Sequence, residues 1–261
     1  MNLKFTIITP SLNQAEYIEE NILSVLNQEY PNFEHIIIDG GSTDGTIEIL
    51  RKYPHLKWIS EKDEGQSHAL NKGFKMATGD ILGWINSDDR LVRGAIQSVA
   101  AYFNKNPHEI AVVGDQEFIN EDSKLIKVVK SRYYSYEYLL NHALGITQNS
   151  TFFKREVFNK IGFLDENLHF AMDLDLFIRI TSIKDIQYLP YTLASYRFHE
   201  DTKTAEGVHN FVREMIIIRK RYSGGRRFSY ANVNNYYTLL TEPLRRVKWL
   251  KRIIEKLRDN S

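Results

Sequence analysis

In the first hundred residues of this chain, apolar segments rich in Ile, Val and Phe alternate with segments whose apolar residues recur at helical spacing. Short polar turns separate the two kinds of segment. This order is typical of a parallel sheet covered by helices, because parallel strands need a crossover connection between them. We therefore predict an α/β fold for residues 1–105, doubly wound around a mostly parallel central sheet.

The same patterns predict where the elements lie. Strands are predicted at residues 3–9, 33–39, 56–60, 80–86, 110–114 and 125–129. Helices are predicted at residues 13–28, 46–53, 66–77, 92–103, 172–182, 210–222 and 243–258. The first helix is expected to be capped by Asn13, with Glu16 as its capping-box partner. Residues 192–206 have few periodic signals and are predicted to form a mobile loop.

Composition limits the chemistry and the cellular location that we expect for the protein. With 261 residues, 43% of them hydrophobic, the chain can form one large core, and the absence of cysteine excludes disulfides and a thiolate nucleophile. There is no run of about 18 apolar residues and no signal-peptide pattern, so a cytoplasmic protein is expected.

Positive charge is concentrated near the end of the chain. Residues 213–258 hold 13 Lys or Arg and three Glu, whereas the other residues hold 21 basic and 30 acidic side chains. The helix predicted at 243–258 has an apolar face among Arg and Lys, so it either lies on the anionic inner face of the cell membrane or packs on protein. Nucleic-acid binding is not expected, because no recognisable module for it is present.

Polar residues gather where three of the predicted strands end. They are Thr9 and Pro10, Asp39 to Gly41, and Asn86 to Asp89. In an open α/β sheet, ligands bind outside the carboxyl ends of the strands. The three segments are therefore expected to meet around one ligand.

Asp39 is expected to accept a hydrogen bond from a nucleobase imide or a ribose hydroxyl, while the glycines beside it let the backbone approach the ligand. The alternative is a helix-capping turn, since Ser42 and Asp44 are common capping and turn residues. We favour the ligand for Asp39 and the turn for Asp44.

Asp88 and Asp89 place two adjacent carboxylates at a strand end, which is unfavourable without a compensating cation or donors. Oxygen ligands of this kind prefer Mg²⁺ or Mn²⁺. Asp88 is therefore the predicted metal ligand, whereas Asp89 has the alternative of capping the next helix. His199 is expected to complete the metal site or to contact a diphosphate, although a lone histidine also fits a structural role.

Asp173 and Asp175 lie at the start of an apolar helix. The functional interpretation is that Asp173 serves as a general base facing the reaction centre. Acidic residues in a first helical turn also stabilise the helix dipole, and this structural alternative holds for both residues and is stronger for Asp175. No P-loop or dinucleotide-binding glycine motif is present, so phosphate charge must be met by metal and basic residues.

In these residues the chain resembles a known family, the family 2 glycosyltransferases, which are bacterial inverting enzymes of the GT-A fold. The resemblance covers about residues 3–205 and rests on five ordered motifs. They are Thr9-Pro-Ser-Leu-Asn13, Asp39-Gly-Gly-Ser-Thr-Asp-Gly-Thr46, Asp63-Glu-Gly-Gln-Ser-His-Ala-Leu-Asn-Lys-Gly73, Gly79-Asp-Ile-Leu-Gly-Trp-Ile-Asn-Ser-Asp-Asp89 and Met172-Asp-Leu-Asp175.

The resemblance implies a role for each matching position. The nucleotide sugar is expected to contact Thr9, Pro10, Asn13, Asp39, Gly41, Ser42, Gly65, Gln66, Asn86, Ser87 and Asp88. The metal is expected on Asp88 and His199, and the base is expected at Asp173. Two positions depart from the family pattern, because Asn86 stands where the metal motif normally begins with Asp, and Met172 stands where Glu is usual.

The predicted organisation follows. Residues 1–105 form a nucleotide-sugar-binding half, residues 106–207 a mixed acceptor-binding half of the same domain, and residues 208–261 a basic helical tail. The predicted function is inverting transfer of a sugar from a nucleoside diphosphate sugar, with UDP as the expected carrier, to a hydroxyl of a glycan or lipid-linked acceptor. The alternatives are a catalytically degenerate nucleotide-sugar-binding protein and a metal-dependent nucleotidyltransferase.

Overall fold

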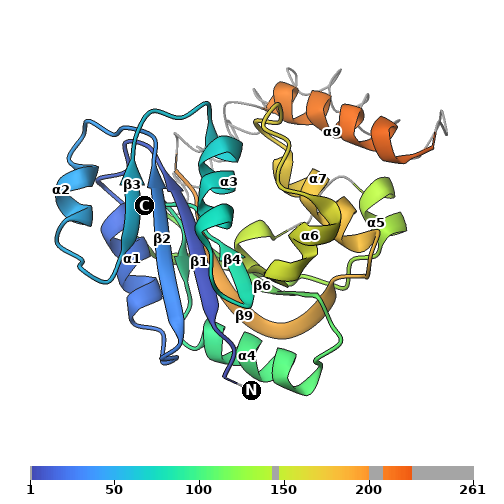
Figure 1. The fold of residues 1–261 in the computed structure, drawn as a ribbon, viewed down its shortest axis with the longest axis horizontal. Helices are drawn as coiled ribbons and strands as arrows, with labels where there is room; N and C mark the ends of the chain where they lie inside the picture. The colour runs from blue at the N-terminus through green and yellow to red at the C-terminus, as the bar shows by residue number, and fades with distance from the viewer. Residues whose placement is uncertain (1, 143–146, 200–207, 225–261) are drawn as a thin grey trace, which may run out of the picture.

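The computed structural model describes residues 2–142, 147–199 and 208–224, and in this part a single nine-stranded sheet carries helices on both faces (Figure 1). The strands are ordered β3-β2-β1-β4-β8-β6-β9-β5, and β7 pairs with β6 outside this path. The strands are β1 (Phe5–Ser11), β2 (Phe33–Asp39), β3 (Lys57–Ser60), β4 (Ile81–Trp84), β5 (Arg90–Leu91), β6 (Ala111–Ile119), β7 (Leu125–Val129), β8 (Thr151–Lys154) and β9 (Gln187–Arg197).

The first four strands are parallel, as the alternation of the sequence predicted. β1 pairs with β2 on one side and with β4 on the other, and β3 extends the sheet beyond β2. Ser11 is in register with Asp39, so β1 and β2 end at the same level. The polar residues that follow these strands therefore lie along one edge of the sheet.

The other half of the sheet is mixed. β8 pairs antiparallel with both β4 and β6, while β9 runs parallel to β6 and antiparallel to β5. The sheet is therefore mostly parallel in its first half and mixed in its second, with helices on both faces, as the predicted α/β class requires. The long strand β9 brings the end of the second half next to the short strand that follows Asp89.

Alternation along β1 places its side chains on two faces. Phe5 and Ile7 pack in the cluster that contains α1 and α4, whereas Ile8 packs with α3 on the opposite face. This alternation is the two-residue period of a strand buried on both sides. The helices of the first half are α1 (Ile18–Leu26), α2 (Thr46–Leu50), α3 (Gln66–Met76) and α4 (Ala95–Lys105).

The helices of the second half share the face of α3. They are α5 (Tyr136–Asn141), α6 (Phe158–Ile161), α7 (Met172–Thr181) and α9 (Val208–Tyr222), with single 3₁₀ turns at Gln148–Ser150 and Arg155–Val157. Val212, Met215 and Ile218 of α9 are buried in the same apolar cluster as α7. Figure 1 shows α9 lying over α7 and α5, so the first helix of the predicted tail is packed on the body. The helix predicted at 243–258 lies outside the described residues.

Two predictions about local structure were wrong. Asn13 does not cap α1, which begins at Ile18 without a side-chain cap, because Asn13 has a left-handed backbone (φ 51°) and accepts a hydrogen bond from the Thr43 amide instead. The predicted loop at 192–206 is also wrong in its first part, since β9 extends to Arg197. The run Gln187–Arg197 is partly buried or exposed in its first six residues and mostly buried in its last five, so it lacks the two-residue alternation that marks a half-buried strand. Residues 200–206 lie outside the described residues.

Candidate functional site

The segment from Asn86 to Asp89 forms a tight turn directly after β4. The Asp89 amide donates to the Asn86 carbonyl at 3.1 Å. The side-chain amide of Asn21, fully buried on α1, donates to the carbonyl oxygens of both Asn86 and Asp89 at 2.9 Å. The backbone that carries Asp88 is therefore held from the first helix, which limits how far the Asp88 carboxylate can move.

Asp88 and His199 meet across 111 positions of sequence. The Nε2 atom of His199 lies 3.1 Å from Oδ2 of Asp88, and the two side chains are 7% and 22% exposed. The rings of His199 and Tyr17 are 5.1 Å apart, so an aromatic side chain from the loop before α1 covers the histidine. The structure thus brings together the two residues that were predicted to hold a metal.

This pair fits a divalent ion that retains other ligands. Mg²⁺ and Mn²⁺ are commonly bound by one or two protein groups, with water and substrate phosphate completing the shell. In the ranges 2–142, 147–199 and 208–224, no cluster of three or more His, Asp or Glu side chains has metal-binding geometry. The Asp88 and His199 pair is therefore suited to a shared ion rather than to a tight all-protein site.

Asp89 plays a different part from its neighbour. Its carboxylate is 2% exposed and accepts from the Arg197 amide at 2.9 Å and from the Asn149 side chain at 3.1 Å. Burial, followed by the charge of Asp88, raises the pKa of Asp89 well above its usual range. The predicted helix cap is wrong, because α4 begins at Ala95 after Gly94. Asp89 instead joins the turn to β9.

Arg197 is a residue that the sequence analysis missed. Its guanidinium is 1% exposed; Nε donates to the Asp88 carbonyl at 2.9 Å, and Nη2 pairs with Glu20. The guanidinium also stacks 4.7 Å from the Tyr17 ring, and Nη1 donates to the turn after β6. Arg197 therefore positions both the Asp88 turn and His199, which follows two residues later.

Gln66 and Asn86 meet at the start of α3. The Gln66 amide donates to Oδ1 of Asn86 at 2.9 Å, and the Trp84 indole donates to the same oxygen at 3.0 Å. Gly65 precedes the helix with φ 117°, a conformation that favours glycine. The predicted donor-pocket residues and Asn86 are thus neighbours at a helix N-terminus, where backbone amides favour negative charge.

Asp39 is fully buried, and its carboxylate accepts four hydrogen bonds. The donors are the Gly41 amide, the Ser42 amide, the Ser42 hydroxyl and the Ser60 hydroxyl. These bonds shape the loop after β2 and leave the carboxylate little capacity for a further donor. Asp44 accepts from the amide and hydroxyl of Thr46 at the start of α2, which confirms its structural role.

The remaining predicted contacts lie in two environments. Asn13 is exposed and joins the β1 and β2 loops, because its backbone N–H donates to the Ser42 hydroxyl at 2.7 Å. Thr9 is fully buried on the α1 side of the sheet, where its hydroxyl lies 3.0 Å from His35. This placement argues against a ligand contact by the Thr9 side chain. Pro10 and Ser87 are also buried.

Asp173 lies in the first turn of α7, where its carboxylate accepts from the Leu174 amide at 2.8 Å. The loop that leads into α7 touches the start of α3, because the Ser67 hydroxyl donates to the Leu168 carbonyl at 2.6 Å. The predicted base and the predicted donor-pocket segment are therefore linked. Asp175 is 1% exposed and bonded to Arg179 and Tyr222, which confirms its structural role.

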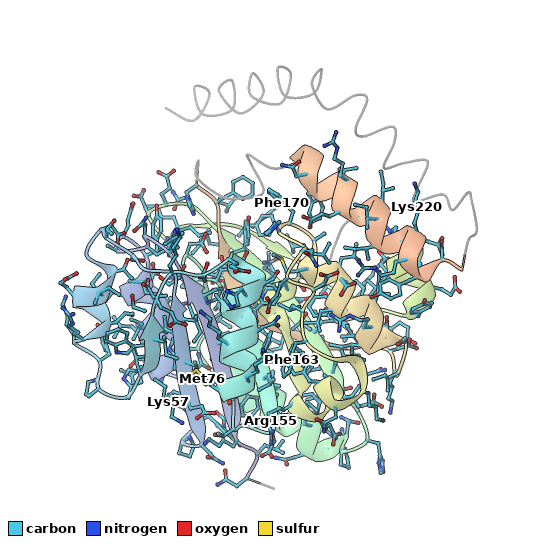
Figure 2. All side chains as sticks on the ribbon, turned by 45° about the horizontal axis from the view of Figure 1, so that its top comes forward. Lys57, Met76, Arg155, Phe163, Phe170 and Lys220 are labelled. Atoms are coloured by element: carbon cyan, nitrogen blue, oxygen red, sulfur yellow. The ribbon has the colours of Figure 1, made fainter. Side chains whose placement is uncertain are left out.

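Glu214 of α9 is a second residue that the sequence analysis missed. Its carboxylate accepts the backbone amides of His169, Phe170 and Ala171 at 2.8 to 2.9 Å. Phe170 lies beside α9 (Figure 2). α7 has no side-chain cap at Ala171, and Glu214 supplies an acceptor for the Ala171 amide and for the two amides that precede the helix. The site around Asp173 therefore depends on a helix that was predicted to belong to the tail.

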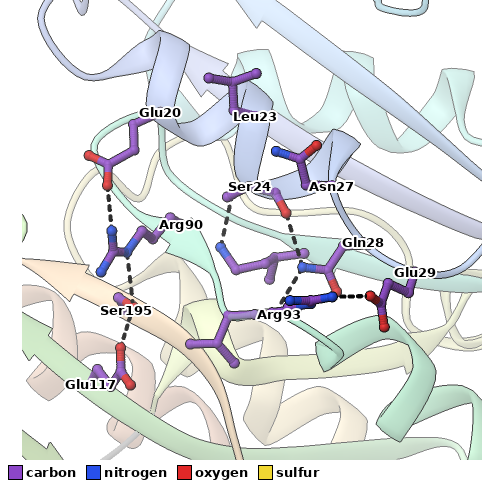
Figure 3. A pocket seen from close by; sticks show the side chains of 12 residues that line it. Glu20, Leu23, Ser24, Asn27, Gln28, Glu29, Arg90, Arg93, Glu117 and Ser195 are labelled. Atoms are coloured by element: carbon purple, nitrogen blue, oxygen red, sulfur yellow. Dashed lines mark hydrogen bonds and ion pairs between the residues drawn. The ribbon is translucent and has the colours of Figure 1, made fainter.

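A hollow of about 690 Å³ lies elsewhere, between α1 and β5 (Figure 3). Its charged side chains satisfy one another, since Arg90 pairs with Glu20 and Arg93 pairs with Glu29. None of the residues predicted for the site lines it. The residues predicted for the site lie instead at the ends of β1, β2 and β4 and at the starts of α3 and α7.

Comparison with known proteins identifies the family of this chain. Residues 6–162, more than half of the chain, match the family described as Glycosyl transferase family 2. The chain belongs to this family. It is 30% identical over 218 residues to an uncharacterized glycosyltransferase of Rickettsia typhi, covering 80% of this chain and 68% of that protein. It is also 30% identical to the putative teichuronic acid biosynthesis glycosyltransferase TuaG of Bacillus subtilis, over 48% of this chain and 51% of TuaG.

Solved structures support the fold. TarS of S. aureus (residues 1–349, in complex with UDP-GlcNAc) superposes with a TM-score of 0.66 at 20% identity, over 83% of this chain and 65% of that TarS fragment. The mannosyltransferase PcManGT of Pyrobaculum calidifontis, in complex with GDP-Man and Mn²⁺, gives 0.63 at 20% identity, over 92% and 72%. The predicted family and GT-A fold are thus confirmed, and the chain is a family 2 glycosyltransferase.

Proposed function

We propose that this family 2 glycosyltransferase moves a sugar from a nucleoside diphosphate sugar to an acceptor hydroxyl in one inverting step. The observation that carries the proposal is the meeting of Asp88 with His199 at the same sheet edge as the Gln66 and Asn86 contact. Two proteins of similar fold are described in complex with nucleotide sugars, TarS with UDP-GlcNAc and PcManGT with GDP-Man, which supports a donor of this class.

The start of α3 and the turn after β4 form the donor side. Gln66 and Asn86 present amide groups, and the N-terminus of α3 favours the negative diphosphate. The carboxylate and imidazole of the Asp88 and His199 pair are suited to holding Mn²⁺ or Mg²⁺ next to it. A divalent ion bound there supplies positive charge beside the diphosphate.

Asp173 is the proposed base. The acceptor oxygen attacks the anomeric carbon while its proton passes to the Asp173 carboxylate. The bond from the anomeric carbon to the diphosphate breaks, and the nucleoside diphosphate leaves with the electron pair. The position of Asp173 in the first turn of α7, next to a loop bonded to α3, supports this role. Base catalysis of this kind contributes about 10² to 10⁴ in rate.

Thermal-shift measurements with UDP-GlcNAc, GDP-Man and related donors test the donor class, each with and without Mn²⁺. At least one donor should raise the Tm more with Mn²⁺ than without it, and slow release of the nucleoside diphosphate should follow. If no donor shifts the Tm, the proposal fails. A shift without any release would favour the alternative of a degenerate nucleotide-sugar-binding protein.

The base is tested separately. Asp173→Asn should keep the donor-induced shift and lose release of the nucleoside diphosphate by about 10²-fold or more. Asp122→Asn is the matched control, because Asp122 lies exposed in the turn after β6. Near-normal turnover by Asp173→Asn would rule out this residue as the base.

The acceptor is proposed to be a glycan or a lipid-linked hydroxyl at the membrane face. The similarity to TuaG, named for teichuronic acid biosynthesis, supports an envelope polysaccharide. Within the described ranges, no helix has the length and apolar character needed to cross a bilayer. The membrane contact predicted for residues 243–258 lies outside those ranges and stays a prediction, which liposome co-sedimentation of the full chain and of a chain without these residues would test.

A further inference from the structure

The strand β7 lies at an edge of the sheet and is exposed along most of its length. Among the described strands it pairs with β6 alone. Leu125, Ile126 and Val128 are 58%, 57% and 49% exposed, and the first two are the most exposed large apolar side chains in the described part of the chain. An edge strand of this kind favours contact with another surface, because its apolar side chains and its unpaired backbone groups face water.

Positive charge accompanies these apolar residues. Residues 123–132 contain four Lys or Arg and no Asp or Glu. Lysine recurs at every third position and is exposed each time, at Lys124, Lys127 and Lys130. The nearest acidic residues in the sequence are Glu121 and Asp122 in the turn before the strand, so four cations stand against two anions, a balance of +2. The strand therefore presents apolar and basic groups together.

Aromatic rings border the strand on one face. Lys127 is in register with Phe118 of β6, and Phe118 is in register with Tyr196 of β9. The rings of Phe118, Tyr196 and Phe198 pack with their centroids 5.5 to 6.1 Å apart. The Lys127 amine lies 5.0 Å from the centre of the Phe118 ring, and Phe198 is 40% exposed. Aromatic rings and long basic side chains are suited to the interface between a membrane and water.

A second copy of the chain fits this edge poorly. An antiparallel pair of β7 strands centred on Lys127 would match the apolar residues of the two copies with one another. The same register places Lys124 opposite Lys130, and Lys127 opposite its own copy. Like charges directly opposite one another destabilise a sheet, and lysine on an edge strand is a common safeguard against such pairing. The charge pattern therefore favours an anionic surface over a second copy.

We propose that β7 and the aromatic rings beside it form a contact surface for an anionic lipid bilayer. The apolar side chains enter the interface, and the lysines meet the lipid phosphates. The affinity of such a contact combines buried apolar area with attraction to anionic lipid. Each lysine near the surface contributes about fivefold to the affinity. The contact itself does not depend on the proposed sugar transfer.

The surface is joined to the candidate site through Arg197. Its Nη1 donates to three oxygen atoms of the turn between β6 and β7, and its Nε donates to the Asp88 carbonyl. A bilayer bound at β7 would therefore lie against the same turn that Arg197 joins to the Asp88 and His199 pair. This arrangement suits an acceptor hydroxyl carried by a lipid, a consequence that rests on the proposed function.

A single reporter locates the contact. The chain has no cysteine, so an introduced cysteine carries the only label. Ile126→Cys, labelled with the polarity-sensitive dye NBD, should show brighter and blue-shifted emission with phosphatidylglycerol vesicles and little change with phosphatidylcholine vesicles. Lys160→Cys is the matched control, because Lys160 is exposed on α6, and its label should not respond. The proposal is overturned if the label at position 126 does not respond, whether or not the chain pellets with the vesicles through residues 243–258.

The charges are tested by co-sedimentation of the full chain with phosphatidylglycerol vesicles. Replacing the three strand lysines by glutamine should weaken binding about 100-fold. A control variant loses three exposed lysines elsewhere, through Lys52→Gln, Lys105→Gln and Lys160→Gln. This control should lose much less affinity. Equal losses in the two variants would indicate attraction by net charge alone and would count against the surface.

The apolar part is tested by Leu125→Ser combined with Ile126→Ser. Both side chains are exposed, so the Tm should stay unchanged while binding to the vesicles falls by about tenfold or more. Unchanged binding would exclude insertion of β7. Sedimentation velocity without vesicles examines the other occupant. A dimer of the natural chain that dissociates in this double variant would identify a second copy at the edge and overturn the proposal.

Discussion

Glu214 joins α9 to the start of α7, and its replacement by alanine should weaken the protein measurably. The change leaves three backbone amides, those of His169, Phe170 and Ala171, without their acceptor. A hydrogen bond to a charged group contributes about 1.5 to 3 kcal/mol, and one at a helix N-terminus adds up to about 1 kcal/mol. Because water can reach part of this half-buried site, we expect a total loss of about 3 kcal/mol.

For a chain of this size that loss corresponds to a Tm decrease of roughly 6 to 12 °C, measured by differential scanning fluorimetry. Glu214→Gln keeps one acceptor oxygen and should lose about half as much. Glu48→Ala is the control, since Glu48 is exposed and its ion pair with Arg51 spans 3.7 Å at the surface. A Glu214→Ala Tm within 1 to 2 °C of the natural value, on the order of the control, would refute the capping argument.

The effect should also be local. Hydrogen exchange of the three capped amides should accelerate in Glu214→Ala more than exchange in the central strand β1, because opening the cap does not require unfolding of the sheet. Since Asp173 lies two residues beyond Ala171, we also expect kcat to fall while the donor affinity changes little. Exchange rates that rise equally everywhere would indicate global destabilisation instead.

Three further predictions concern residues outside this cap. Asp88→Asn and His199→Gln should each reduce the Mn²⁺-dependent part of the donor-induced Tm rise, and equal rises in all three proteins would exclude the pair as metal ligands. Arg197→Met should destabilise the protein by about 2 to 4 kcal/mol, because it removes the buried donors to the carbonyl oxygens of Asp88 and Glu121, while Glu20 keeps its ion pair with Arg90; chemical denaturation measures this loss. Burial raises the pKa of Glu34, but hydrogen bonds from Lys57, Thr6 and Thr78 outweigh it and lower the pKa to about 2. The lowered pKa of Glu34 stabilises the folded protein by about 2 kcal/mol, after allowance for the half-exposed Lys57. This contribution is present above pH 4.5 and is lost as the pH falls toward 2. Glu34→Gln should therefore flatten the decrease of the Tm over that pH range.

Local patterns predicted the bounds of several strands and helices well. β2 and β7 lie where they were expected, and α3 and α7 begin at their predicted residues. Their signals are local, because each has a continuous apolar run or a helical period bounded by polar turns. The sequence also located the polar segments at the ends of β1, β2 and β4, since a parallel sheet places such ends along one edge.

Interactions between distant segments were predicted poorly. Asn13 has the composition of a helix cap, yet the β2 loop offers it the Thr43 amide, and this contact determines its conformation. The roles of Asp39 and Thr9 changed for the same reason, because burial and neighbouring donors decide what a polar side chain can bind. Glu214 and Arg219 fall within the predicted basic tail, and only the packing of α9 on α5 and α7 gives them their hydrogen-bond partners.

By itself, the sequence determined the α/β class, the family and the residue types available at the sheet edge. Only the tertiary structure decided which of those residues meet. Asp88 and His199 are 111 positions apart and become neighbours because β9 runs back beside β5, which places Arg197 under the Asp88 carbonyl. Such a contact depends on strand order and register, and these are set by the packing of the whole sheet rather than by the residues on either side of Asp88.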